Sequence, residues 1–154
     1  MSYYEFLLFG HLLFVAVWVG TDVCLQIFAL RARGAGPERM VQFTADVEWL
    51  GLRLLTPASL LVAVFGVLLV IDSEVFEFSQ FWVTAGLVAF LASAITGSAF
   101  LGPETGRISK LGAERGPQDP EVQARISRVF LVSRIELIIL IFLIFDMVVK
   151  PGFP

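Results

Sequence analysis

Four continuous apolar stretches constrain this chain more than any other feature of its sequence. They cover approximately residues 6–30, 47–71, 81–102 and 129–149. A helix needs about 20 mainly apolar residues to cross the hydrocarbon core of a bilayer, and each stretch is long enough. None of them alternates apolar and polar residues, as the strands of a membrane β-barrel do. The sequence therefore predicts an all-α membrane protein, a single domain over residues 1–154 built as a four-helix transmembrane bundle.

Composition supports this class and excludes others. Of the 154 residues, 57% are hydrophobic and only 16% are charged, which is too apolar for a soluble domain of this length. The lone Cys24 excludes an intrachain disulfide and a cysteine-based metal site. No basic tract suggests nucleic-acid binding. Because the N-terminus lacks a basic region and a small-residue cleavage site, we expect the first helix to be retained rather than removed as a signal peptide.

The connecting segments predict a topology. The segments after the first and third stretches contain the basic residues Arg31, Arg33, Arg39, Arg107, Lys110, Arg115, Arg125 and Arg128. The segment after the second stretch contains only acidic charges, and Lys150 is the remaining base outside the stretches. Positively charged connections stay in the cytoplasm. Both termini are therefore expected on the extracytoplasmic side of the membrane.

Local signals predict where the helices begin and end. Gly34 and Gly36 can end the first helix, and Pro37 can begin the second, which would run to about residue 71. Asp119 and Pro120 form an N-cap pair that can open the fourth helix. We expect residues 103–128 to form a solvated connection, with an amphipathic helix at the lipid headgroups as the alternative. Pro57 lies inside the second stretch and predicts a kink.

The first apolar stretch carries polar side chains on one face. At about 100° per residue, His11, Trp18 and Asp22 fall close to one line, and Gln26 lies about 60° from it. Lipid offers these side chains no hydrogen-bond partner, so their face should point into the bundle.

An intramembrane charge cluster is predicted in the inner half of the bilayer. Asp22, Arg53, Arg134 and Glu136 fall at similar depths, with Gln26 beside them. Arg134 and Glu136 are two residues apart and must point to opposite sides of their helix. We expect ion pairs between helices that clamp the bundle. The alternative is a proton or ion path, as in a small proton-coupled transporter or channel.

His11 is the only histidine, and it is predicted in the outer half near Asp146 and Met147. Four-helix bundles commonly hold haem, and histidine is its usual axial ligand. Haem b is therefore the candidate cofactor, with His11 as the iron ligand, Met147 as a possible second ligand and Asp146 orienting the ring. A hydrogen-bonded core histidine, a five-coordinate haem and two His11 side chains meeting across a dimer are left open. The residues assign no catalytic role, so enzymatic activity stays undecided.

A stripe of small side chains follows the third stretch at intervals of four residues: Ala85, Ala89, Ser93 and Gly97. Such a stripe lets a neighbouring helix approach closely. Packing within the bundle is the expected role. The alternative is that the chain is a non-catalytic membrane partner subunit, contacted along this stripe or along residues 103–128. We also expect a homo-oligomer, most simply a dimer.

Several segments resemble a bacterial family of predicted integral membrane proteins of unknown function (DUF2269). These are "HLLFVAVWVG", "RLLTPASLLVAVFGVLLV", "GSAFLGPETGR", "GPQDPEVQAR" and "RIELIILIFLIFDMVVKPG". The resemblance covers nearly the whole chain and implies four spans in a bacterial inner membrane. The first helix is also similar to HemJ-type protoporphyrinogen oxidases and CopD-type copper proteins, which have a histidine a few residues before a tryptophan. In HemJ-type proteins that histidine is linked to haem, so the likeness implies a haem-linked role for His11 alone. Protoporphyrinogen oxidase activity does not carry over, because Val19-Gly20-Thr21-Asp22 stands where HemJ-type enzymes have Leu-Pro-Arg.

Overall fold

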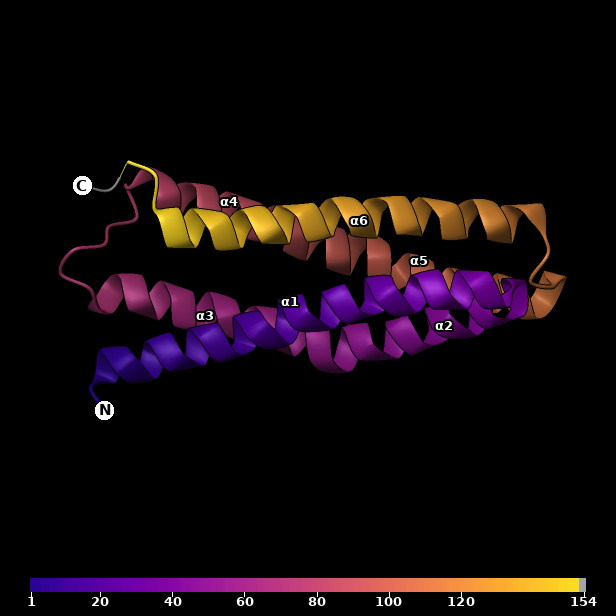
Figure 1. Cartoon of the computed structure of the whole chain (residues 1–154), viewed down its shortest axis with the longest axis horizontal. Coiled ribbons are helices and arrows are strands. Elements are labelled where there is room, and N and C mark those ends of the chain that lie inside the picture. The colour runs from indigo at the N-terminus through magenta and orange to yellow at the C-terminus, as the bar shows by residue number, and fades with distance from the viewer. Residues whose placement is uncertain (153–154) are drawn as a thin grey trace.

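The computed structural model describes residues 1–152, and within them the chain forms helices and no strands. Its elements are α1 (Tyr3–Ala35), α2 (Pro37–Leu50), η1 (Gly51–Leu55), α3 (Thr56–Asp72), α4 (Phe81–Ile95), η2 (Thr96–Leu101), α5 (Gly102–Arg115) and α6 (Pro120–Val149). The π-helical segments η1 and η2 join their neighbours without a break. The described chain is therefore four long rods: α1, then α2–η1–α3, then α4–η2–α5, then α6 (Figure 1). The predicted all-helical bundle is confirmed at this level.

The rods begin and end where the local signals predict. Gly36 ends α1 with a φ of +112°, a conformation that favours glycine, and Pro37 begins α2. At the start of α6, the Asp119 side chain accepts hydrogen bonds from the backbone N–H groups of Glu121 and Val122. These contacts satisfy N–H groups that have no partner inside the helix.

A proline follows each π-helical segment. Pro57 comes two residues after η1, and Pro103 comes two residues after η2. A proline inside a helix lacks an N–H and clashes with the preceding turn, and a wider turn is one way to accommodate it. The Thr56 hydroxyl donates to the Gly51 carbonyl oxygen at 2.8 Å, and the backbone N–H of Thr56 donates to the same oxygen.

The first three rods are long and apolar enough to cross a membrane: Tyr3–Ala35, Pro37–Asp72 and Phe81–Arg115. The fourth rod, α6, carries Arg134, Glu136 and Asp146 within its apolar part. Both ends of the described chain lie at the same end of the bundle, which we call the terminal end (Figure 1). Which side of a membrane this end faces stays a prediction.

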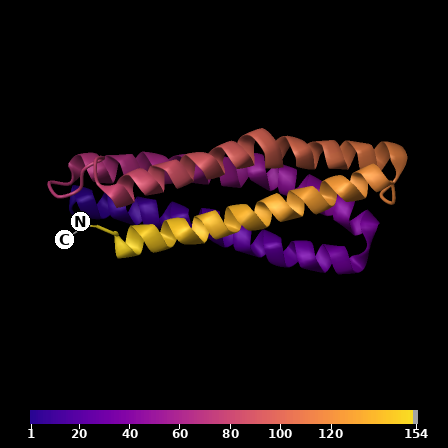
Figure 2. The same ribbon diagram turned by 90° about the horizontal axis from the view of Figure 1, so that it is seen from above.

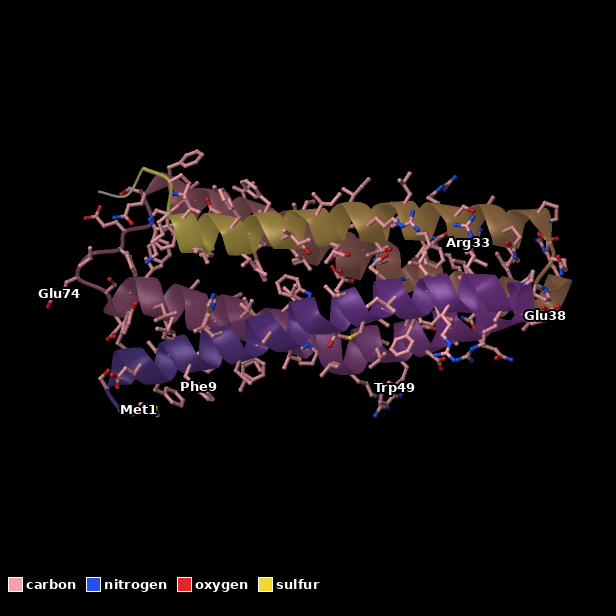
Figure 3. The ribbon with its side chains drawn as sticks, in the orientation of Figure 1. Met1, Phe9, Arg33, Glu38, Trp49 and Glu74 are labelled. Carbon is pink, nitrogen blue, oxygen red and sulfur yellow. The ribbon has the colours of Figure 1, made fainter. Side chains whose placement is uncertain are left out.

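The two halves of the bundle are packed differently. In the terminal half, α1 packs against α3, and α4 packs against α6, so the rods form two pairs (Figures 1 and 2). In the other half, which we call the turn half, α2 packs against both α1 and α5. Charged side chains gather there, as Arg33 and Glu38 show in Figure 3.

The structure corrects the expectation for residues 103–128. Most of this segment is helical and continues rods three and four, and only residues 116–119 connect them. One apolar cluster fills the turn half: Ala29, Ala32, Met40, Phe43, Ile108, Val122, Ile126 and Val129. Because Ile108 and Val122 are completely buried in this cluster, the segment packs into the bundle.

Ion pairs join α5 and α6 next to their connection at residues 116–119. Glu104 of α5 is buried, and its carboxylate accepts hydrogen bonds from Arg107 and from Arg125 of α6. Arg125 also donates to Glu121, and Arg115 donates to the other oxygen of Glu121. The hydrogen bond from Arg125 lowers the pKa of the exposed Glu121 carboxyl below its ordinary value of 4.5.

We predict that Gly112→Ala destabilises the turn half. A Cβ atom at Gly112 would lie 2.6 Å from Val41 Cγ1 of α2, so α2 and α5 would have to separate. Overpacking of this kind costs about 1–3 kcal/mol. The thermal midpoint of the detergent-purified variant should fall. Gly20→Ala is the matched control, because a Cβ atom there meets nothing within 4 Å; an equal fall in both variants would contradict the assignment.

We also predict a pH dependence from Glu121. Because its folded pKa is lowered, its ion pairs stabilise the fold above pH 4.5, and this contribution is lost as the pH falls through the lowered value. The difference in thermal midpoint between wild type and Glu121→Gln should therefore be present at neutral pH and shrink in acid. Glu114→Gln removes an exposed acid at the end of α5, next to the same connection, that forms no ion pair within the described residues, and it should show no such change. A Glu121→Gln difference that does not vary with pH would contradict this prediction.

Candidate functional site

An apolar cavity lies between the two helix pairs of the terminal half. Its volume is about 280 Å³, and side chains of α1, α3, α4, α6 and the connection between α3 and α4 line it. His11 and Trp18 lie on the α1/α3 side, and Met147 lies on the α4/α6 side. The cavity thus brings together His11 and Met147, which the sequence placed at the same depth.

The imidazole of His11 is held by the backbone of α3. Its Nδ1 lies 3.0 Å from the carbonyl oxygen of Val62. A carbonyl oxygen can only accept, so Nδ1 carries the proton and donates, and in the neutral ring Nε2 is left as an unprotonated nitrogen. No residue within 1–152 forms a hydrogen bond with Nε2. The ring is thus oriented, and one nitrogen remains available to a ligand.

A glycine makes room for this ring. A Cβ atom at Gly66 would lie 3.1 Å from Cε1 of His11, so any larger residue would press on the imidazole. Across the cavity, the Met147 methyl group lies directly against Gly86 of α4. Neither glycine was singled out from the sequence, because each is needed only for a contact with another rod.

The neighbours of Met147 are also polar. Asp146 is 1% exposed, and neither of its carboxyl oxygens has a hydrogen-bond partner within residues 1–152. The Val62 carbonyl, and not Asp146, orients the His11 ring. Lys150 lines the terminal end of the cavity, where its Nζ lies 4.3 Å from the centre of the Phe76 ring and 5.5 Å from that of Trp82.

A second group of polar side chains lies deeper in the bundle. We call it the polar layer; it consists of Asp22 and Gln26 of α1, Ser93 of α4, and Ser133 and Glu136 of α6. Gln26 donates to the Ser133 hydroxyl at 3.1 Å. Ser93 donates to Glu136 Oε1 at 2.8 Å. The polar layer therefore links three rods, and Ser133 is a member that the sequence analysis missed.

The predicted ion pairs within the charge cluster are wrong. Neither Arg53 nor Arg134 pairs with Asp22 or Glu136 within the described residues. Both arginines are exposed, and Arg53 lies over the ring of Trp49, with 5.5 Å between its Cζ and the ring centre; Figure 3 shows Trp49 on the outside of the bundle. A long arginine side chain can carry its charge away from an apolar region, whereas a short carboxylate on an inward face cannot.

The small-residue stripe of α4 and η2 packs inside the chain. Ser93 is completely buried, and a Cβ atom at Gly97 would lie 3.6 Å from Glu136 Oε1. The stripe therefore faces α6, as expected for close packing within the bundle. Ala85, Ala89 and Gly97 are half-buried, and contact of the stripe with a partner subunit stays a prediction.

Apolar side chains separate the polar layer from the cavity. Trp18, Ala58, Val62 and Leu140 form a buried cluster. Trp18 and Leu140 each lie one helical turn from the acid of their own rod, toward the terminal end. The cavity and the polar layer are thus two distinct sites.

Comparison of the chain with protein family models, with curated proteins and with solved structures found no match.

We predict that the two arginines and Ser93 respond differently to substitution. Arg53→Gln and Arg134→Gln should change stability by no more than about 0.5 kcal/mol, because neither side chain pairs with a buried acid. Ser93→Ala leaves a buried oxygen of Glu136 without its donor and should cost about 1–3 kcal/mol. Thermal midpoints in detergent measure all three. Ser98→Ala, an exposed serine of the same rod, is the control, and a large loss in either arginine variant would contradict the structure.

Proposed function

We propose that this protein binds haem b in the cavity of the terminal half and serves a redox or haem-handling role. The observation that carries this proposal is the hydrogen bonding of the His11 imidazole. Its Nδ1–H is engaged by the Val62 carbonyl, and its Nε2 has no partner beside an apolar cavity. A histidine that ligates a metal commonly donates its other N–H to a backbone carbonyl in this way.

The other groups around the cavity fit the same ligand. Met147 offers a thioether from the opposite helix pair, which suits a second axial position. Haem carries two carboxylates, and Lys150 places a positive charge at the terminal end of the cavity. When bound, haem would supply one-electron chemistry at its iron. The chain itself would orient the imidazole and keep water from the macrocycle.

We further propose that all four rods cross a bacterial inner membrane with both termini outside. Three rods have the required length and apolarity, and α6 packs against one of them, α4. The basic residues of the two tight turns lie at the end opposite the termini, which supports a cytoplasmic turn half. The resemblance to bacterial membrane proteins points the same way.

The test is an absorbance spectrum of protein purified in detergent from haem-replete cells, oxidised and then reduced. We expect a Soret band in wild type and its loss in His11→Ala, because the axial nitrogen is gone. Met147→Leu should keep the band but shift it, if the thioether ligates iron. Ser133→Ala, which alters only the polar layer, should leave the spectrum unchanged. A colourless wild type, or an unaltered band in His11→Ala, would remove the proposal.

A further inference from the structure

Two carboxyl groups approach each other inside the polar layer. Gln26 of α1 donates to Ser133 of α6, and these two rods run in opposite directions (Figure 1), so Asp22, one turn before Gln26, and Glu136, three residues after Ser133, come to the same level of the bundle. Asp22 is 9% exposed and Glu136 is 8% exposed. Two acids from different rods thus share a buried position in the middle of the bundle.

The hydrogen bonds around the two acids are incomplete. Glu136 Oε1 accepts from the Ser93 hydroxyl, whereas Asp22 Oδ2 is buried and has no partner within residues 1–152. Arg53 of η1 and Arg134 of α6, the two arginines expected at this depth, are both exposed, and neither forms an ion pair with these acids within residues 1–152. Within its described residues α4 contributes no charged side chain. Within residues 1–152, no cation therefore neutralises the pair.

Two ionised carboxylates cannot remain side by side in such a place. Each would lose its hydration without a compensating charge, and the two would repel each other. One bound proton removes one of the two charges and with it their repulsion. We propose that Asp22 and Glu136 form a proton-binding site that holds one proton at neutral pH. This inference does not depend on the proposed haem site, because the cluster around Trp18 and Leu140 separates the two.

A proton suits this site better than a metal ion. Within residues 1–152, no group of three or more histidine, cysteine, aspartate or glutamate side chains is placed to hold a metal. Cations such as Ca²⁺ and Mg²⁺ take about six or more oxygen ligands, whereas a proton needs only one acceptor and gains from a second. The two carboxyl groups and one serine hydroxyl provide too few oxygen ligands for such a metal ion.

The surroundings indicate how the site would be used. The apolar cluster around Trp18 closes it toward the terminal end, and the cluster that includes Ala29 and Val129 closes it toward the turn half. The π-helical segment η2 lies beside Glu136 through Gly97, and such segments occur often at functional sites. Ionisable side chains buried between membrane-spanning helices commonly belong to proton relays, and this is the use that the position of the pair favours.

Infrared spectroscopy of the purified protein tests the proposal, because a protonated carboxyl has its own C=O band that shifts in D₂O. We expect this band at neutral pH in wild type, and its reduction in Asp22→Asn/Glu136→Gln. Asp146 is also buried and can contribute to the band, so Asp146→Asn is the matched variant. In Asp146→Asn the intact pair should still give the band, whether or not the double variant folds. Circular dichroism verifies folding of each variant.

The other outcomes overturn the proposal. Absence of the band in Asp146→Asn would mean that Asp22 and Glu136 are both ionised. An equal band in wild type and in a folded double variant would assign the proton elsewhere. A band that disappears when sodium or potassium chloride is added at constant pH would make the pair a metal-cation site. A band insensitive to these salts supports proton binding.

Discussion

The self-contained hydrogen bonding of each helical rod is the constraint on which the rest of this structure depends. An apolar chain can place its backbone away from water only if every N–H and C=O finds a partner along the same rod. Pro57 and Pro103 interrupt that pattern, and each is preceded by a π-helical segment that keeps its rod continuous. Because the backbone is satisfied in this way, only side chains remain to be matched between rods.

The polar side chains are matched in two different ways. His11 finds a backbone acceptor at Val62, and the close approach of α1 and α3 at Gly66 makes that hydrogen bond possible. The acids of the polar layer have hydroxyl and amide neighbours but no cation. The first arrangement leaves a nitrogen available for a ligand, and the second leaves a charge that a proton can neutralise. Both sites thus arise because an apolar bundle offers few hydrogen-bond partners and few cations to the polar side chains buried in it.

The structure agrees with the sequence analysis where the signals are local. Gly36 with Pro37, and Asp119 with Pro120, mark helix ends because their effects arise from their own backbone conformations. The inward face of α1 is also confirmed, since Trp18 and Asp22 are buried and His11 lines the cavity. The expected ion pairs are absent because depth along a helix does not state which way a side chain points. Residues 103–128 looked like a solvated connection because they are polar, yet Ile108 and Val122 bury one face.

The amino-acid sequence alone was sufficient for the helical class, the number of rods, the helix ends at Gly36–Pro37 and Asp119–Pro120, and the rotation of α1. Those properties depend on the length of apolar stretches, on capping residues and on a period of about 3.6 residues, all of which act within one rod. Contacts between rods decided the rest. The choice of Val62 as the partner of His11, the outward direction of Arg53 and Arg134, and the meeting of Asp22 with Glu136 depend on the relative rotation of two or more rods. That rotation is set by the packing of side chains that lie far apart in the sequence, such as Gly66 against His11 and Gly97 against Glu136.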